Sequence, residues 1–255
     1  MDRIVTFGAW VQIAHPASAE IFGRLGFDWI CVDLEHGAID IDSLADIFRA
    51  AESHGSVPLA RLPYADTIWI KRTLDAGARG LIIPMVTSAE QAEASVRQAK
   101  YPPRGERGFG YSRANLHGID FERYIKDAND EIAVVMQIEH YQGIAAIDSI
   151  LDIEGVDAAF IGPLDLSGSF GKTGQLDCTE MVEALSVFRR ACAAHGKAAG
   201  MHLVHPGTDS VDRAIRDGYS MIALGLDNVF LTTAARQALD AGQAALSAAA
   251  ANARL

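Results

Sequence analysis

Two carboxylates stand at the ends of segments that look buried. One segment, residues 133–140, reads A-V-V-M-Q-I-E-H and brings Glu139 to its end, and a second, residues 158–167, reads A-A-F-I-G-P-L-D-L-S and contains Asp165. Carboxylate oxygens suit Mg²⁺ or Mn²⁺, which keep several water ligands and need few ligands from the protein. Acids at such positions also serve as helix caps or ion-pair partners, so position alone leaves both roles open.

Three more polar residues follow apolar segments. Asp33 and His36 lie three residues apart, and a histidine oriented by a carboxylate can act as a general base, although an ordinary surface histidine fits the same pattern. Arg61 ends the run P-L-A-R, where a guanidinium is costly unless it binds an anion or an internal acid. These residue types indicate proton transfer and anion binding.

Eight short apolar runs alternate with eight segments of helical periodicity. The expected strands cover residues 5–13, 27–34, 56–62, 79–86, 131–139, 156–162, 197–204 and 219–226. The expected helices cover residues 17–25, 42–54, 65–76, 88–99, 141–152, 179–195, 208–217 and 228–249. Six of the helical segments are followed by a glycine, as expected just past a helix: Gly26, Gly55, Gly77, Gly155, Gly196 and Gly218. The connection over residues 100–130 is too long for a plain link and predicts a functional or interface loop.

Strands that are apolar on both faces and alternate with helices imply a parallel sheet covered by helices. Eight such units in 255 residues match a single-domain α/β protein with the (β/α)8 TIM-barrel fold. A doubly wound open sheet is the alternative, but the turn after the first run, V-Q-I-A-H-P-A-S, lacks the glycines of a dinucleotide site. In a barrel the carboxyl ends of the strands meet at one mouth, which would bring the acids, the histidine and the arginine together.

The composition narrows the class of partner. The net charge is −11 and no cluster of Lys and Arg is visible, so small substrates are expected and nucleic acid is not. Three cysteines without C-x-x-C spacing predict neither a disulfide framework nor a zinc cluster. No signal-peptide pattern and no run of 18 apolar residues occur, so we expect a cytoplasmic protein that does not bind membranes.

Several motifs, taken in order, resemble those of one enzyme family. They read D-L-E-H-G, A-R-L-P, G-A-R-G-L-I-I-P-M-V, Y-P-P-R-G-E-R-G-F-G, Q-I-E and E-G-V-D-A-A-F-I-G-P-L-D-L-S. The chain is similar in these motifs to the HpcH/HpaI family of class II pyruvate aldolases, from the first expected strand to about residue 240. The resemblance implies a metal-dependent barrel enzyme that cleaves 4-hydroxy-2-oxo acids to pyruvate, or hydroxypyruvate, and an aldehyde.

The resemblance also implies roles for particular residues. Glu139 and Asp165 would bind a divalent cation, Mg²⁺, Mn²⁺ or Co²⁺. Arg61 would contact the pyruvate moiety, and Gln137 would lie beside it. His36, paired with the carboxylate three residues earlier, resembles an acid/base dyad.

Two further implications concern substrate binding and assembly. The segment Pro163, Leu164 and Asp165 would help to bind the substrate carboxylate through peptide amides, from which Pro163 is excluded because it has no N–H. Family members assemble as homohexamers in which the last helix, here about residues 228–250, packs on a neighbouring subunit.

Three alternative functions would each require other features of the sequence. A lysine Schiff base needs a desolvated amine inside the barrel, whereas all five lysines fall in expected helices, loops or a strand start. A lyase that acts on CoA thioesters needs a basic groove, for which Arg104, Arg107 and Arg113 are the candidates. A non-catalytic barrel that binds a 2-oxo acid is the third reading, and no appended domain supports it.

Overall fold

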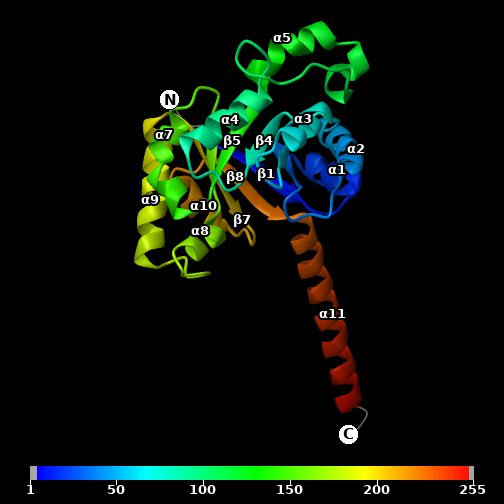
Figure 1. The fold of residues 1–255 in the computed structure, drawn as a ribbon. Helices are drawn as coiled ribbons and strands as arrows, with labels where there is room; N and C mark the ends of the chain where they lie inside the picture. Colours follow the sequence, from blue (N-terminus) through cyan, green and yellow to red (C-terminus); the bar gives the residue numbers. More distant parts are fainter. Residues whose placement is uncertain (1–4, 253–255) are drawn as a thin grey trace.

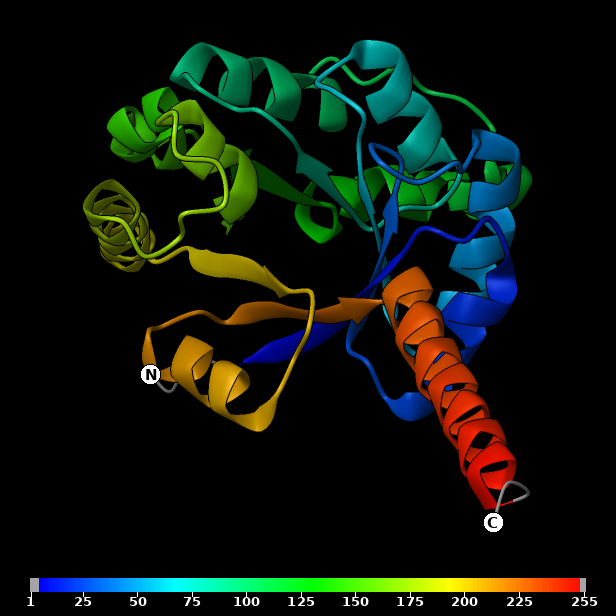
Figure 2. The ribbon, with the colours of Figure 1, turned by 90° about the horizontal axis from the view of Figure 1, so that it is seen from below.

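Eight parallel strands close into a barrel in the computed structural model, which describes residues 5–252 (Figures 1 and 2). Each strand pairs with the next one in the sequence, and the last pairs with the first. The strands are β1 (Thr6–Val11), β2 (Trp29–Asp33), β3 (Val57–Arg61), β4 (Gly80–Ile83), β5 (Ala133–Ile138), β6 (Ala158–Ile161), β7 (Ala198–Leu203) and β8 (Met221–Leu226). The (β/α)8 barrel predicted from the sequence is confirmed.

Helices surround the barrel (Figure 2). They are α1 (Pro16–Leu25), α2 (Ile41–Glu52), α3 (Thr67–Asp75), α4 (Ala89–Ala99), η1 (Arg113–Gly118), α5 (Phe121–Glu131), α6 (Tyr141–Ala145), α7 (Ile147–Leu151), α8 (Pro163–Ser169), α9 (Thr179–Ala194), α10 (Thr208–Arg216) and α11 (Asp227–Asn252). The six glycines predicted to follow helices all have positive φ angles. Gly26 illustrates the reason, because at φ 88° its N–H reaches the Gly23 carbonyl and ends α1.

Three segments differ from the sequence prediction. Residues 141–152 form two short helices, α6 and α7, instead of one. Residues 163–169 form α8, where the sequence predicts no element; Pro163 occupies its first turn, a position that suits proline. The connection over residues 100–130 contains η1 and α5, and α5 lies at the end of the barrel opposite α11 (Figure 1).

Apolar side chains fill the barrel as well as the layer between barrel and helices. Trp29 and Phe160 belong to the inner cluster, and two strand glycines make room for their rings. A Cβ atom at Gly8 would lie 2.1 Å from the Trp29 ring, and one at Gly200 would lie 2.3 Å from the Phe160 ring. The barrel is therefore plugged below its mouth, and polar residues at the carboxyl ends of the strands face a closed floor.

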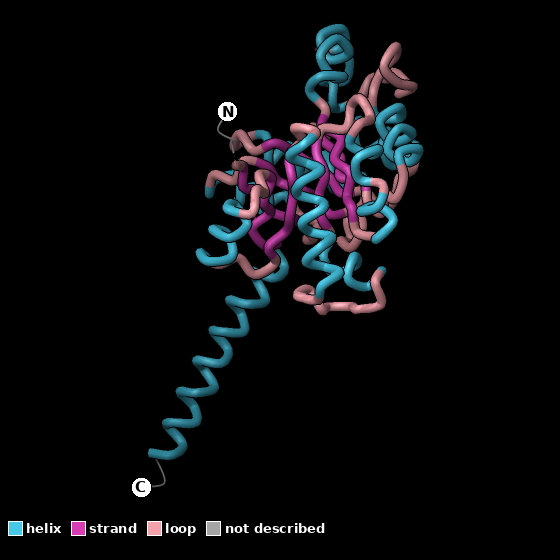
Figure 3. The backbone as a smooth tube through the Cα atoms, turned by 90° about the vertical axis from the view of Figure 1, so that its left-hand side faces the viewer, coloured by secondary structure: helices cyan, strands magenta, loops and turns pink. Residues whose placement is uncertain are grey.

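The last helix, α11, starts directly after β8 and projects away from the barrel (Figures 1 and 3). Its apolar side chains Leu231, Leu239 and Leu246 are exposed. None of the helices within residues 5–252, α11 included, has the length and hydropathy needed to cross a bilayer.

Candidate active site

A cavity of about 360 Å³ opens at the carboxyl ends of the strands. All eight residues predicted for the site line it: Asp33, His36, Arg61, Gln137, Glu139, Pro163, Leu164 and Asp165. The sequence therefore predicted which residues meet at the mouth, and the contacts between them determine what each can do.

Arg61 and Asp33 form a two-pronged ion pair between neighbouring strands. The Arg61 Nε donates to Asp33 Oδ1 at 2.9 Å, and an Nη donates to Oδ2 at 2.7 Å. The register of β2 and β3 places the two residues directly opposite each other. Burial alone would raise the pKa of Asp33, but the hydrogen bonds and charge of Arg61 hold that pKa below its ordinary value. The internal salt bridge that the sequence left open for Arg61 is thus present.

Two further side chains hold this ion pair in place. The Glu35 carboxylate lies 3.1 Å from Arg61 Nε, and burial raises the pKa of Glu35. The carbon at the centre of the Arg61 guanidinium lies 4.3 Å from the centre of the Trp10 ring, a cation–π contact. Trp10 was not among the predicted site residues, because it reads as a core residue.

The Asp33–His36 dyad implied by the resemblance differs from the observed contacts. Asp33 Oδ1 accepts the backbone N–H of His36 at 3.2 Å, and both carboxylate oxygens bind Arg61. Within residues 5–252 no hydrogen bond joins the His36 ring to the Asp33 carboxylate. The Asp33 carboxylate thus orients the loop that carries His36, while the exposed imidazole lines the cavity without it.

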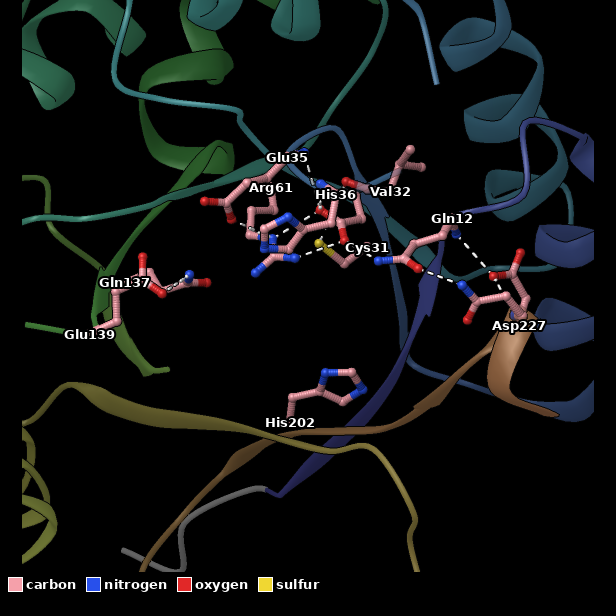
Figure 4. A network of polar contacts seen from close by, with 12 residues as sticks. Gln12, Cys31, Val32, Glu35, His36, Arg61, Gln137, Glu139, His202 and Asp227 are labelled. Carbon is pink, nitrogen blue, oxygen red and sulfur yellow. Dashed lines mark hydrogen bonds and ion pairs between the residues drawn. The ribbon is translucent and has the colours of Figure 1, made fainter. Parts of the chain in front are cut away.

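Glu139 is buried at the end of β5 and faces donors that carry no charge. Its Oε1 accepts the Met85 N–H at 2.8 Å, and its Oε2 accepts the Gln137 side-chain amide at 2.6 Å (Figure 4). Met85 adopts φ 54°, a strained conformation for a non-glycine residue. Burial raises the pKa of Glu139 to about 7, because these two donors offset only part of the lost hydration.

The approach of β6 to Glu139 depends on a glycine. A Cβ atom at Gly162 would lie 2.6 Å from Glu139 Oε2, closer than a carbon and an oxygen can approach. Directly after Gly162, α8 begins and carries the exposed Asp165 in its first turn. The charges of Glu35 and Asp165 both raise the pKa of Glu139, so the three carboxylates are close enough to interact.

These donors fit a divalent cation. Glu139 and Asp165 contribute oxygen ligands on the wall of one cavity, and neither forms an ion pair among the residues the structure describes. A buried carboxylate with a raised pKa is stabilised by a nearby cation. No group of three or more His, Cys, Asp or Glu side chains within residues 5–252 is arranged to hold a metal, so a cation at this wall would have Glu139 and Asp165 as its acidic ligands.

Two further histidines, His15 and His202, differ in their relation to the cavity. His202, on β7, lines it, whereas the His15 ring accepts the Ala17 N–H and caps α1. Asn228, in the first turn of α11, also lines the cavity, and its amide donates to the side chain of Gln12 at 2.6 Å. Gln12 in turn donates to Asp33 at 2.6 Å, so a chain of hydrogen bonds runs from α11 to Arg61 (Figure 4).

The connection over residues 100–130 supplies no residue to this cavity. Its three candidate CoA-binding arginines are engaged elsewhere. Arg107 is buried, paired with Asp75 and stacked on Tyr101. Arg104 pairs with Asp130 and Arg113 with Glu52. The basic groove that a CoA lyase would need is therefore not formed by them.

None of the five lysines lines the cavity. Lys100 is the most deeply buried, and its ammonium group donates to the carbonyl oxygens of Asn129 and Ile132 outside the barrel. Lys197 donates to the carbonyl of Val156. The geometry thus offers no amine for a Schiff base at the mouth.

A model of the family described as "HpcH/HpaI aldolase/citrate lyase" matches residues 6–234. The chain belongs to this family. It is 40% identical over 238 residues to a hydroxypyruvate/pyruvate aldolase of Roseovarius nubinhibens, covering 91% of this chain and 90% of that one. It is 35% identical to a 5-keto-4-deoxy-D-glucarate aldolase of Escherichia coli, covering 92% and 91%. A solved HpcH/HpaI aldolase/citrate lyase family protein from Burkholderia cenocepacia superposes with a TM-score of 0.89 at 31% identity, covering 94% and 95%.

Membership of the HpcH/HpaI family confirms the resemblance read from the motifs. Because the aldolase relatives share 35–40% identity over most of the chain, the protein is an aldolase, that is, a carbon–carbon lyase. The cavity at the barrel mouth is lined by the charged side chains Asp33, Arg61, Glu139 and Asp165.

Proposed function

We propose that the protein is a metal-dependent aldolase that reversibly cleaves 4-hydroxy-2-oxo acids to pyruvate or hydroxypyruvate and an aldehyde. One observation carries the proposal: a guanidinium and a pair of acids without a counter-ion face each other across one cavity. The guanidinium can bind the anionic oxygens of a 2-oxo acid. The two acids can hold a cation, whose positive charge would stabilise the enolate. The names of the aldolase relatives support the same substrate class.

Glu139 and Asp165 would hold the cation, which we propose to be Mg²⁺, Mn²⁺ or Co²⁺. When bound, a divalent ion supplies positive charge beside the oxygen on which negative charge develops during cleavage. The protein's own contribution is to orient the ligands. The Met85 N–H and the Gln137 amide fix the Glu139 carboxylate, and Gly162 lets the next strand approach it.

Arg61 would bind the carboxylate or keto oxygen of the three-carbon fragment. Asp33 and Glu35 hold its Nε and one Nη, and the other Nη has no hydrogen-bond partner among residues 5–252. This free group can donate to the substrate without rearrangement of the pair. The amides of Leu164 and Asp165, in the first turn of α8, would donate to the same carboxylate.

His36 would act as the base. In cleavage its imidazole takes the proton of the C4 hydroxyl while the bond between C3 and C4 breaks. The electron pair of that bond becomes the enolate of the three-carbon fragment, and C4 becomes the aldehyde carbon. In the synthetic direction the same group returns the proton. The Asp33 carboxylate assists by holding the backbone of the His36 loop.

Activity with and without metal tests the proposal. The purified protein, treated with EDTA, is expected to lose pyruvate release from 4-hydroxy-2-oxo acids, and Mg²⁺, Mn²⁺ or Co²⁺ should restore it. Aldol synthesis from pyruvate or hydroxypyruvate with a panel of aldehydes gives the same answer in reverse. Activity that survives EDTA, together with borohydride trapping of pyruvate on the protein, would contradict the metal mechanism. Release of no product from any such acid would favour a non-catalytic binding barrel.

We also propose that the protein forms a homohexamer in which α11 packs on a neighbouring subunit. The exposed apolar side chains along this projecting helix support such a contact. Light scattering of the full chain should give an oligomer, and replacement of Leu231 and Leu239 by glutamate should lower the mass. An unchanged mass would place the contact elsewhere. An intact chain that is monomeric would contradict the assembly.

A further inference from the structure

His202 lines the cavity and has no role in the mechanism above. Its ring lies against the Trp10 ring, with centroids 5.3 Å apart and planes 11° from parallel. Its Nε2 lies 3.2 Å from the carbonyl oxygen of Gly225. Gly225 adopts φ 71°, and a Cβ atom there would lie 2.4 Å from the Phe230 ring. Stacking and the carbonyl contact together fix the orientation of the imidazole.

The contact with Gly225 determines which nitrogen carries the proton. A carbonyl oxygen can only accept, so Nε2 must be the donor. Burial, and then the charge of Arg61, lower the pKa of His202 to about 4, although the Gly225 carbonyl acts in the opposite direction. The ring is therefore neutral near pH 7, and its Nδ1 carries a lone pair.

This lone pair is free on the cavity side. Within residues 5–252 no group donates a hydrogen bond to Nδ1. The atom is also not fully buried, so a bound ligand can reach it. Figure 4 shows the ring extending from β7 toward Arg61, with Nδ1 on the edge that faces it. Trp10 contacts both side chains, and the charge of Arg61 is close enough to lower the pKa of His202.

The chemistry of a neutral acceptor limits what it can bind. A pyruvate fragment held at Arg61 offers only carboxylate and keto oxygens, which are acceptors and cannot bond to Nδ1. Hydroxypyruvate carries one more group, a hydroxyl on C3, and that hydroxyl is a donor. A site with a fixed acceptor favours the ligand that can pair with it.

We infer that His202 is a specificity-determining residue whose Nδ1 accepts a hydrogen bond from the C3 hydroxyl of a hydroxypyruvate-type donor. The inference rests on the proposed function and adds to it the preferred donor class, a 3-hydroxy-2-oxo acid. His202 binds the substrate in this role and takes no part in moving the C4 proton.

Donor preference in variants at this position tests the inference. The protein, loaded with Mg²⁺, is assayed with pyruvate and with hydroxypyruvate, each paired with propanal, which has no hydroxyl. His202→Leu removes the acceptor and should lower kcat/KM for hydroxypyruvate roughly 10-fold, with a change of less than about 3-fold for pyruvate. His202→Asn keeps an acceptor oxygen and should retain most of the preference. His205→Leu, at an exposed position outside the cavity, is the matched control.

Calorimetric binding of the two donors separates this inference from the proposed function. If no variant and no wild-type protein turns over either donor, the proposed function fails, while the ratio of the two dissociation constants still tests His202. An equal loss for both donors in His202→Leu, in binding or turnover, would overturn the inference, because the ring would then only shape the site. A loss that appears with glycolaldehyde but not with propanal would also overturn it, by assigning Nδ1 to the aldehyde partner.

Discussion

Two buried acids on opposite sides of the cavity have different surroundings. On the β2–β3 side, Asp33 is fully buried and binds the Arg61 guanidinium through both of its oxygens. On the β5–β6 side, Glu139 is 3% exposed and meets only an amide and a backbone N–H. Their pKa values move in opposite directions, down for Asp33 and up to about 7 for Glu139.

The difference distinguishes Asp33, which positions Arg61, from Glu139, which we propose as a metal ligand. A carboxylate whose charge is already matched inside the protein serves the fold and the orientation of its partner. A carboxylate that is buried without a matching charge is unstable as an anion, and a cation supplied from outside corrects this. Substitution of the two acids by their neutral amides should therefore have opposite effects on stability.

The largest effect is expected on activity in Glu139→Gln. Loss of the proposed anionic metal ligand should lower kcat about 10³-fold, since electrostatic stabilisation of the reacting oxygen contributes on that order. The free energy of unfolding without metal should stay the same or rise, because a neutral amide is easier to bury. Turnover, calorimetric Mg²⁺ titration and urea unfolding measure the three quantities.

Glu183→Gln removes one charge at an exposed position and is the matched control for the variant at position 139. It should change neither turnover nor metal affinity. A Glu139→Gln variant that binds Mg²⁺ as tightly as the wild type would contradict the ligand role.

The opposite result is expected for Asp33→Asn. Removal of the charge breaks the two-pronged ion pair and leaves the half-buried Glu35 as the acid beside the Arg61 guanidinium, which should lower the free energy of unfolding by roughly 3 kcal/mol. Metal affinity should change little, because Asp33 lies on the other side of the cavity from Glu139 and Asp165, the proposed metal ligands. Urea unfolding compared with the Glu139→Gln variant measures the contrast, and equal destabilisation of both would remove the distinction drawn between the two acids.

Glu139 and Asp33 should also contribute oppositely to the pH dependence of the free energy of unfolding. The pKa of Glu139 in the fold, about 7, lies above its ordinary 4.5, so the folded chain binds this proton more tightly than the unfolded chain does. The resulting stability is complete below about pH 4.5 and is lost as the pH rises through 7, an effect on the order of 3 kcal/mol. For Asp33, whose pKa is lowered, the contribution is present above its ordinary 3.8 and is lost as the pH falls through the lowered value.

Urea unfolding of the metal-free protein between pH 4.5 and 7.5 measures this decline. It should be absent in Glu139→Gln. Saturating Mg²⁺ should also reduce it, because a bound cation stabilises the ionised carboxylate. An identical decline in the wild type and in Glu139→Gln would show that another group is responsible.

The residues at the cavity could be predicted from the sequence because a barrel brings the carboxyl ends of all its strands to one face. Once eight apolar runs are recognised, polar residues at or shortly after the end of each run are expected at the mouth, and Glu139, Arg61 and Asp165 are among them. Helix α8 escaped prediction because its seven residues, rich in Ser and Gly, give no apolar period.

The partners of these residues could not be read, because they depend on register. Asp33 lies opposite Arg61 only because β2 and β3 pair at that offset, and no local pattern specifies it. The three-residue spacing of Asp33 and His36 suggested a dyad. In the structure both oxygens of the Asp33 carboxylate instead accept hydrogen bonds from the Arg61 guanidinium, which is the stronger partner. Asn228 gave no signal either, since it lies past the last strand in a helix that otherwise extends from the barrel.

The smallest effect is expected in Gln12→Ala. Gln12 donates to Asp33 and accepts from Asn228, so it supports the paired side of the cavity without touching the β5–β6 acids. Its loss should lower kcat/KM about 5-fold and stability by about 2 kcal/mol, because one hydrogen bond to a buried carboxylate and one to an amide are removed. Steady-state kinetics and urea unfolding measure both, with Gln175→Ala at an exposed position as the control.

A double-mutant cycle decides whether Gln12 acts through the ion pair. If it positions Asp33 and thereby Arg61, then Gln12→Ala should cost much less in a protein that already carries Arg61→Lys, because a lysine cannot form the two-pronged bond. Additive losses would mean that Gln12 acts on the substrate directly. They would also mean that the hydrogen-bond chain from Asn228 of α11 through Gln12 does not help to position Arg61.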